Sequence, residues 1–452
     1  MSYDTIHRLN DSLNGLVWGP AMLALIIGVG IYLSFGTGFI QVTKFGYMWK
    51  NTIASLFRAD SGGTKGSENI TPFQALTAAL AGTAGVGNIA GVAGAIAKGG
   101  PGALFWMWVS AFFGMAVKYS EIVLALRYRQ TDAEGKFYGG PMYYMEKGLG
   151  TKGLAVVFSL FGGLCCFGIG NAAQASEISA AIEALTGLDN GVMIGLLLAA
   201  ITAAALLGGI RRISNVTSYL VPFMALLYAF AAIVILGSNL EKLPAAFGLI
   251  FRDAFNSGSA VNGIIGYLFA DSARYGIARG VFSNEAGLGS SPIAHAAADA
   301  KGPVEQGLWG IFEVFADTIV MCTLTGLVVI ISGLYAGELS GGALTAAAFD
   351  MLLPYGGAFV QVSIVLFALA TILGWSYYGE RCWGYLSNNS RAVSVAFKAV
   401  YAAVAFIGAS ANRALLVWDI ADTLNGLMAL PNLIALIFLS RTVFSLTRRR
   451  EV

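Results

Sequence analysis

Long apolar runs recur along the whole chain, and they limit the folds that the chain can adopt. About eleven such runs can be distinguished, and each is long enough to cross a membrane core of about 30 Å as a helix. They cover approximately residues 16–38, 70–98, 103–128, 152–184, 190–208, 214–238, 257–281, 304–333, 357–386, 393–410 and 416–440. Runs of this length suit helices rather than the alternating strands of about 10 residues that build membrane barrels.

The composition supports a membrane protein. The chain is 57% hydrophobic and only 12% charged, whereas about a quarter of the residues of a soluble domain are charged. We therefore expect an all-α membrane protein in which residues 1–452 form one integral membrane domain. The stretch "LPAAFGLIFRDAFN" at 243–256 is amphipathic, and we expect it to form a surface helix rather than a span.

The basic residues predict the orientation of the chain. Cytoplasmic connections of membrane proteins are enriched in Lys and Arg. With eleven spans, most basic residues fall on one side, which also carries the C-terminal sequence "RTVFSLTRRR". We therefore expect a multi-pass protein of the cell (inner) membrane with its N-terminus outside and its C-terminus in the cytoplasm. The opening sequence "MSYDTIHRLNDSLNG" shows no basic region or cleavage site typical of a signal peptide.

Several kinds of chemistry find no support in the sequence. The four cysteines lie in apolar runs, so buried thiols are expected rather than disulfides or a metal site, and the two histidines are far apart. No phosphate-binding loop of the Walker type is present, so ATP is not expected to drive the protein directly. No catalytic constellation is evident, and we expect neither an enzyme nor a cofactor. The net charge of +2 gives no indication of a nucleic-acid partner.

The stretch "ALAGTAGVGNIAGVAGAIAKGGPGALFWMW" at 79–108 is apolar like a membrane span, yet it holds five glycines between positions 82 and 94. A helix can break inside a membrane only where protein or a polar cavity covers it. Such a break offers carbonyl groups to a cation and a helix N-terminus to an anion. The alternative is close helix packing, which the four-residue spacing of Gly87, Gly91 and Ala95 would suit. The mid-membrane amide of Asn88 favours a break at 82–88.

A second break is expected in the corresponding span of the other half of the chain. The stretch "GIIGY" at 263–267 lies five spans further on, as two inverted five-helix repeats would place it. The stretch "FSNEAGLGSSP" at 282–292 is a rival position, but its distance from residue 257 suggests a gate or loop at the cytoplasmic surface. The predicted organisation is an extra helix at 16–38, a first repeat at 70–238, a second repeat at 257–410 and a last helix at 416–440.

Four long motifs resemble those of the alanine/glycine:cation symporter family, also called sodium:alanine symporters. They are "GGPGALFWMWVSAFFG" at 99–114, "ARYGIARGVFSNEAGLGSSPIAHAAA" at 273–298, "ILGWSYYGERCW" at 372–383 and "WDIADTLNGLMALPNLI" at 418–434. This family belongs to the superfamily with the leucine-transporter-type (LeuT) fold. The stretch "GTAGVGN" resembles the unwound first core helix of that fold. Asp271 and Ser272 depart from the small apolar residues that we expect there for this family.

The resemblance implies a secondary symporter that couples Na⁺ or H⁺ flow to the uptake of small neutral amino acids, chiefly alanine and glycine. The expected partners are therefore the amino acid, Na⁺ as coupling ion and membrane lipid. An amino-acid-gated facilitator or channel is one alternative, and a sensor derived from a transporter is another. The sequence does not distinguish Na⁺ from H⁺ as the coupling ion, or alanine from glycine as the substrate. It also does not indicate which enantiomer is preferred or what the oligomeric state is.

The substrate ligands are expected around the two breaks. No charged residue lies between Thr71 and Ala97, so a bound zwitterion must use backbone groups, hydroxyls, amides or a bound cation. Asn171 and Gln174 are three residues apart and are expected to share a helix face at mid-depth, where they bind substrate or join neighbouring helices. The family resemblance favours Asn171 as a ligand. The predicted substrate-binding residues are Thr83, Gly85, Gly87, Asn88, Phe167, Asn171, Gln174, Gly263, Gly266 and Trp375.

Sodium requires hard oxygen ligands. The resemblance implies that the carbonyl groups of Ala81 and Ala84 and the hydroxyl of Thr371 form the sodium site, although Thr371 can also bond its own helix backbone. Other intramembrane charges have open roles: Lys118 and Glu121 are close enough in sequence to pair, and Arg279 and Glu285 are expected to form a cytoplasmic gate. The acids Glu177, Glu313, Asp317 and Asp422 remain functional candidates among which the sequence does not choose.

Overall fold

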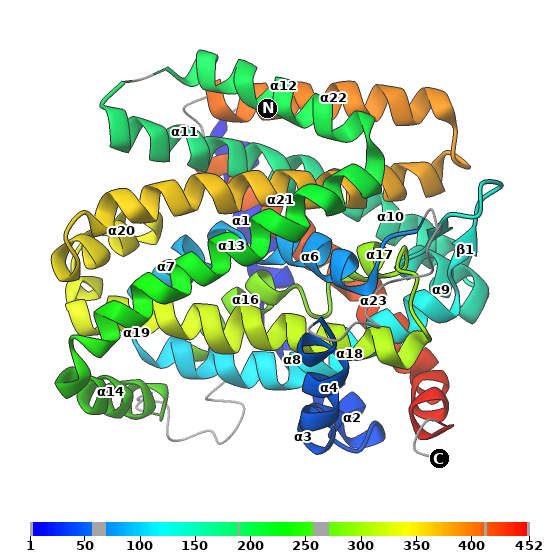
Figure 1. The fold of residues 1–452 in the computed structure, drawn as a ribbon, viewed down its shortest axis with the longest axis horizontal. Coiled ribbons are helices and arrows are strands. Elements are labelled where there is room, and N and C mark those ends of the chain that lie inside the picture. Colours follow the sequence, from blue (N-terminus) through cyan, green and yellow to red (C-terminus); the bar gives the residue numbers. More distant parts are fainter. Residues whose placement is uncertain (1–2, 57–68, 189, 256–270, 411–413, 450–452) are drawn as a thin grey trace.

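The computed structural model describes residues 3–56, 69–188, 190–255, 271–410 and 414–449 (Figure 1). Its elements are, in chain order, α1 Tyr3–Val17, α2 Pro20–Gly36, α3 Ile40–Thr43, α4 Phe45–Asn51, α5 Ile53–Leu56, α6 Pro72–Thr83, η1 Val86–Asn88, α7 Ala90–Gly99, α8 Gly102–Arg127, β1 Gln130–Thr131, β2 Phe137–Tyr138, α9 Pro141–Leu149, α10 Lys152–Phe167, η2 Gly168–Ala172, α11 Ala173–Thr186, α12 Gly191–Leu207, α13 Gly209–Gly237, η3 Leu240–Lys242, α14 Leu243–Phe255, α16 Asp271–Asn284, α17 Pro292–His295, α18 Pro303–Val314, η4 Phe315–Cys322, α19 Thr323–Ser332, η5 Leu334–Ala336, α20 Gly341–Leu352, α21 Gly356–Leu386, α22 Arg391–Ser410 and α23 Ala414–Arg449.

Helices dominate, as predicted for an all-α membrane protein. Eight described helices are long and apolar enough to cross a membrane: Asn10–Gly36, Gly102–Arg127, Lys152–Thr186, Gly209–Gly237, Pro303–Ser332, Gly356–Leu386, Arg391–Ser410 and Ile420–Arg449. Of the other predicted spans, 70–98 is interrupted, 190–208 corresponds to the 17-residue helix α12, and most of 257–281 lies outside the described residues. The number of eleven spans and the inverted repeats therefore stay predictions.

The interrupted helix pair α6 and α7 lies at the centre of the bundle (Figure 1). Helix α6 begins with a reciprocal cap, in which Thr71 Oγ1 accepts from the Gln74 N–H at 3.2 Å and Gln74 Oε1 accepts from the Thr71 N–H at 3.0 Å. Pro72 occupies the first helical turn, where no donor is needed. Sequence signals thus fix the start of α6, while its end at Thr83 is set by the glycine-rich segment that follows.

Long helices surround this centre. Helix α8 packs along both α16 and α18, and α21 packs against α10, α11 and α20. Helices α12 and α22 pack on each other at one edge of the bundle (Figure 1). The predicted surface helix at 243–256 is present as α14, whose Phe251 ring lies 5.7 Å from that of Phe105 on α8.

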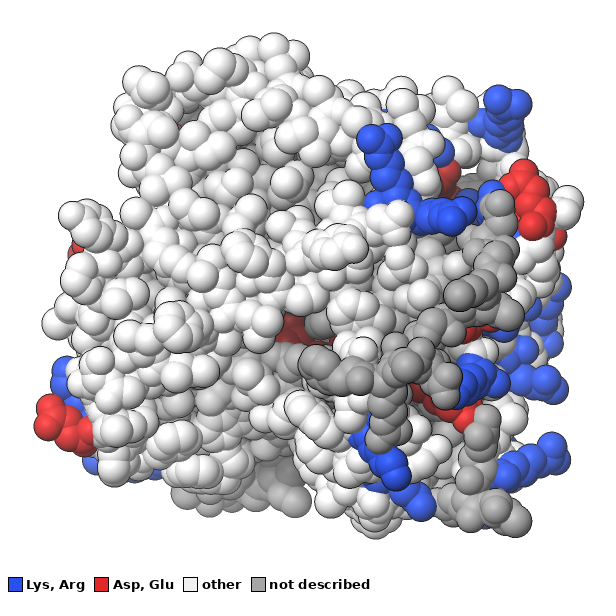
Figure 2. Space-filling view, in the orientation of Figure 1, with Lys and Arg blue, Asp and Glu red and all other residues white. Residues whose placement is uncertain are grey.

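Charged side chains are unevenly distributed. Figure 2 shows Lys and Arg gathered on the right-hand side of the molecule, over the region that carries β1 and α9 in Figure 1. Strands β1 and β2 form a small antiparallel hairpin there, with Gln130 opposite Tyr138 and Thr131 opposite Phe137. The positive-inside rule predicts that this side faces the cytoplasm.

Candidate functional site

The predicted interruption after α6 is present. Ala84 (φ −74°, ψ 74°) and Gly85 (φ −118°, ψ −154°) leave the helical conformation before η1 and α7 resume it. The Gly85 N–H donates to the Thr83 carbonyl at 2.8 Å, instead of to the carbonyl four residues earlier. The chain is therefore broken in the middle of an apolar span, and both ends of the break are covered by protein.

The break redirects the hydrogen bonds of two carbonyl groups. In a continuous helix, the N–H groups of Gly85 and Asn88 would donate to the carbonyls of Ala81 and Ala84. They donate instead to Thr83, at 2.8 Å, and to Gly85, at 3.2 Å. The carbonyls of Ala81 and Ala84 thus lose their helical donors.

Thr371 on α21 lies directly against this break. A Cβ atom added to Gly85 would collide with Thr371 Oγ1. The Thr371 hydroxyl donates to the Phe367 carbonyl of its own helix at 3.0 Å, but a hydroxyl oxygen keeps lone pairs for a further ligand. Among the described residues, no group of three or more His, Cys, Asp or Glu side chains is arranged to hold a metal ion.

A second interruption follows α16 and faces the first. Residues between Asn284 and Pro292 leave the helix, with Glu285 (φ 54°), Gly287 (φ 96°) and Gly289 (φ 81°) in left-handed conformations. Glycine adopts this conformation without the steric penalty that a side chain brings, whereas Glu285 is a genuine outlier. Such outliers persist where the surrounding structure holds them, and they cluster at functional sites.

The prediction that 282–292 forms a gate or loop at the cytoplasmic surface is wrong. All residues from 281 to 298 are buried. Helix α16 packs along α7 and α8, and α17 packs along α6, so the segment crosses the centre of the bundle beside the first break. The predicted break at 263–267, with Gly263 and Gly266, lies outside the described residues.

A small cavity of about 20 Å³ lies between the two breaks. This is room for about one water molecule, so a larger ligand requires its walls to move. The lining residues come from four separate parts of the chain: Gly82, Thr83, Gly85, Val86, Gly87, Ile169, Gln174, Phe282, Glu285, Thr371 and Trp375. Of the predicted ligands, Thr83, Gly85, Gly87, Gln174, Thr371 and Trp375 are thus brought together.

Two polar groups in this lining can hold a positively charged ligand. Glu285 Oε1 accepts from Trp375 Nε1 at 3.0 Å, and its other oxygen accepts from Ser290 Oγ. Both donors are neutral, and Glu285 forms no ion pair with a described Lys or Arg. Gln174 donates from Nε2 to the Ile169 carbonyl at 3.0 Å, while its buried Oε1 has no partner among the described residues. Burying an acceptor without a hydrogen-bond donor costs free energy unless a ligand supplies the donor.

Sequence reasoning missed Glu285 as part of the site. The absence of charge between Thr71 and Ala97 suggested a pocket without a fixed charge, and the acidic residue in "FSNEAGLG" was attributed to the surface. The signal that could have identified it is the combination of an acid with two nearby glycines in a stretch flanked by apolar residues. Phe282, from the same stretch, was also not predicted to line the pocket.

Three of the predicted substrate ligands that the structure describes do not line the cavity. Asn88 donates from Nδ2 to Asp317 Oδ1 at 2.7 Å, which ties the first break to η4. Asn171 donates from Nδ2 to the Tyr401 carbonyl on α22 at 2.7 Å, so its role as a substrate ligand stays a prediction. The Phe167 ring packs on α22, with its centroid 5.6 Å from that of Phe397.

The other intramembrane charges form pairs that the sequence did not predict. Lys118 Nζ lies 3.4 Å from Glu313 Oε1 rather than pairing with Glu121. Glu121 Oε1 instead accepts from Asn432 Nδ2 at 2.5 Å and from the Gly287 N–H at 3.1 Å. These contacts hold the second break against α8.

The predicted gate between Arg279 and Glu285 is also not formed. Arg279 Nη2 lies 3.8 Å from Asp422 Oδ2 on α23. Of the four acids with open roles, Glu313 and Asp422 therefore have basic partners, and Asp317 accepts from neutral groups, including Ser283 Oγ at 2.8 Å. Glu177 lies near α20, with Oε2 3.9 Å from the position of a Cβ atom on Gly342.

The chain is similar in sequence to known proteins over nearly its whole length. A family model described as the sodium:alanine symporter family matches residues 3–451. The chain is 48% identical over 450 residues to the sodium/alanine symporter AgcS of Methanococcus maripaludis, covering 97% of this chain and 96% of that protein. It is 37% identical to a Bacillus subtilis protein named "Probable sodium/glutamine symporter GlnT" (96% and 88% covered) and 34% identical to the B. subtilis amino-acid carrier protein AlsT (93% and 87% covered).

Proposed function

Because the chain belongs to the sodium:alanine symporter family, we propose that it couples inward flow of Na⁺, or of H⁺, to the uptake of small neutral amino acids, chiefly alanine and glycine. Cation-coupled amino-acid symport is the common activity of this family. We also propose that transport proceeds by alternating access, in which the central cavity opens in turn to each side of the membrane.

The observation that carries this proposal is the buried cavity between two helix breaks, lined by backbone, two threonine residues, one amide and one carboxylate. A free amino acid carries a carboxylate and an ammonium group, so it needs both kinds of partner in one small space. Broken membrane helices supply such partners without burying additional charged side chains.

We place the substrate carboxylate against the backbone at Gly85–Gly87. The N–H groups at the start of a helix carry partial positive charge, and α7 begins at Ala90, three residues after Gly87. Gly87 leaves room for the approach, since a Cβ atom there would make only ordinary contact with Phe282 Cδ1 at 3.6 Å.

The substrate ammonium belongs on the opposite side of the cavity. Glu285 supplies a negative charge there, and Gln174 Oε1 supplies the acceptor that has no partner among the described residues. Charge-assisted hydrogen bonds of this kind are about twice as strong as neutral ones. Phe282 and Trp375 form aromatic walls that limit the side chain to a small size, which favours alanine and glycine.

The coupling cation fits between the first break and α21. The carbonyls of Ala81 and Ala84 have lost their helical donors, and Thr371 Oγ1 lies against Gly85. These are oxygen ligands of the kind that hard cations prefer. A proton would instead be carried by a carboxylate, for which Glu285 is the group in the cavity.

Charge balance gives a reason for coupling. A zwitterion adds no net charge, so Glu285 leaves the site with one negative charge until a cation binds, and a net charge inside a membrane is costly. The fully loaded site is neutral overall. One cation moving down 100 mV releases about 2.3 kcal/mol, which sustains roughly a 50-fold gradient of a neutral solute.

We expect Gln174→Ala to weaken alanine binding. Removing this buried acceptor should cost about 1–3 kcal/mol, or about 5- to 150-fold in affinity. Asn171→Ala is the matched control, because its amide faces Tyr401 rather than the cavity. We expect that control to lower the melting temperature with little change in alanine affinity. Calorimetry on both purified variants checks this, and the reverse pattern would favour Asn171 as the ligand.

Electrical recording tests the proposed coupling. Because a neutral substrate moves together with a cation, adding alanine should produce an inward positive current on a solid-supported membrane. The recording is made in Na⁺ at neutral pH and in Na⁺-free buffer at acidic pH, which separates the two coupling ions. The absence of current under both conditions would count against symport.

A further inference from the structure

A second, larger cavity of about 410 Å³ lies on the side of the bundle that is rich in Lys and Arg. Small-molecule sites commonly occupy about 300–1,000 Å³. Its walls come from the linker before α6, the β1–β2 hairpin, the turn between α12 and α13, the residue Ala297 after α17, and helix α21. The positive-inside rule predicts that it opens toward the cytoplasm.

Arg381 on α21 is the unusual group in this cavity. Its buried Nε atom has no hydrogen-bond partner among the described residues, and its guanidinium forms no ion pair with a described acid. Its contacts are aromatic, with the guanidinium carbon 5.7 Å from the Tyr138 ring centroid and 5.6 Å from that of Tyr377. The fork of donors on an arginine matches a carboxylate.

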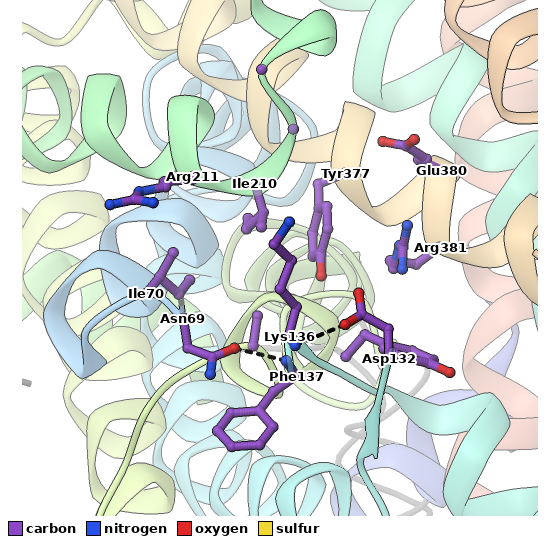
Figure 3. A pocket seen from close by; sticks show the side chains of 14 residues that line it. Asn69, Ile70, Asp132, Lys136, Phe137, Ile210, Arg211, Tyr377, Glu380 and Arg381 are labelled. Carbon is purple, nitrogen blue, oxygen red and sulfur yellow. Dashed lines mark hydrogen bonds between the residues drawn. The ribbon is translucent and has the colours of Figure 1, made fainter. Parts of the chain in front are cut away.

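The other charged residues of the lining are two acids and two bases, namely Asp132, Glu380, Lys136 and Arg211. Glu380 is already paired with Lys398 at 3.0 Å, whereas Asp132 forms no ion pair with a described Lys or Arg. Figure 3 shows Arg381 and Asp132 on one side of the cavity and Arg211 on the other. A small ligand with one carboxylate and one ammonium group can therefore use Arg381 and Asp132 together.

Helix α21 connects this cavity with the central one. Trp375 lines the central cavity, and Tyr377 and Arg381 line the second. Six residues of helix separate Trp375 from Arg381, a rise of about 9 Å. Between them, the buried Tyr378 hydroxyl lies 3.0 Å from the position of a Cβ atom on Gly82, which lines the central cavity.

We propose that the cavity beside Arg381 is a second, weaker amino-acid site on the release side of the transport path, in which Arg381 holds the substrate carboxylate and Asp132 attracts the ammonium group. This inference rests on the proposed transport function. It predicts that Arg381 determines how the protein handles amino acid arriving from the cytoplasmic side, with little influence on capture from the outside.

The direct test compares the two directions of transport in oriented proteoliposomes. In Arg381→Gln, the KM for alanine presented on the cytoplasmic side should rise about tenfold or more, and the KM from the outer side should stay unchanged. Arg381→Lys should raise the KM on the cytoplasmic side less than Arg381→Gln does, because lysine keeps the positive charge but lacks the planar fork of donors. Arg391→Gln removes the same charge from an exposed position outside this cavity and should change neither KM. Equal changes in both directions, or no change, would overturn the proposal.

A binding measurement separates this site from the central one. Gly85→Leu fills the central cavity at Thr371, so weak alanine binding detected on the purified variant by saturation-transfer NMR should come from the second cavity. That signal should disappear in the double variant Gly85→Leu/Arg381→Gln. A signal that survives in the double variant, or one that inorganic phosphate gives and alanine does not, would overturn the proposal. Failure of the transport function itself would appear differently, as the absence of cation-driven alanine uptake in the unaltered protein.

Discussion

Replacing Glu285 by glutamine is expected to lower the affinity for alanine by about two to four orders of magnitude. Glutamine keeps the size of the side chain and an oxygen that can accept from Trp375 Nε1, whereas the charge and the acceptor for Ser290 Oγ are removed. Breaking a buried charge pair by removing one partner costs about 3–5 kcal/mol, which gives the stated range. Calorimetric titration of the purified variant with alanine in Na⁺ measures the effect.

Glu121→Gln is the matched control for this prediction. Glu121 is also fully buried and bound by neutral donors, the Gly287 N–H and Asn432 Nδ2, but it does not line the central cavity. A glutamine oxygen can accept from both donors. We therefore expect Glu121→Gln to bind alanine within a few-fold of the unaltered protein. If Glu285→Gln binds alanine equally well, the ammonium group is held elsewhere.

Substituting Gly85 by alanine should cause the second large effect, a loss of about 5- to 150-fold in apparent Na⁺ affinity. The added Cβ would collide with Thr371 Oγ1, and overpacking of this kind costs about 1–3 kcal/mol. The backbone of Gly85 has a negative φ that alanine tolerates, so steric conflict alone is tested. The Na⁺ dependence of alanine uptake provides the measurement.

Gly87→Ala gives the comparison within the same break. A Cβ there meets Phe282 Cδ1 at 3.6 Å and Ser283 Cα at 3.7 Å, which are ordinary contacts. The apparent Na⁺ affinity should therefore stay close to that of the unaltered protein. Similar losses of apparent Na⁺ affinity in Gly85→Ala and Gly87→Ala would show that the general loss of glycine flexibility matters more than the space beside Thr371.

The first break could be predicted from sequence because the signal is local. Five glycines within an apolar span indicate an interruption whatever surrounds it, and the structure places the break where the glycines are. The depth of the segment at 282–292 was predicted wrongly because its composition resembles that of a surface loop. Polar residues such as Ser283 and Ser290 suggest exposure to water, yet here Ser283 donates to Asp317 and Ser290 to Glu285. Irregular backbone is tolerated inside a membrane protein when protein covers it.

The orientation of Asn171 illustrates a different limit. The expectation that Asn171 and Gln174 share a face assumes a regular α-helix. The chain instead forms a π-helical turn at Gly168–Ala172, which inserts an extra residue and shifts the side chains that follow. Gln174 consequently lines the cavity while Asn171 faces Tyr401. Such turns depend on tertiary packing, and here a Cβ at Gly170 would clash with the Trp375 side chain.

Accumulation of labelled alanine in proteoliposomes tests the central claim most directly. With an inward Na⁺ gradient and a negative interior, or with an inward H⁺ gradient in a parallel sample, the account predicts that internal alanine rises above its external concentration under at least one gradient. A cation ionophore should abolish that rise. Entry that stops at equal concentrations would indicate a facilitator, and no entry under either gradient would contradict amino-acid symport altogether.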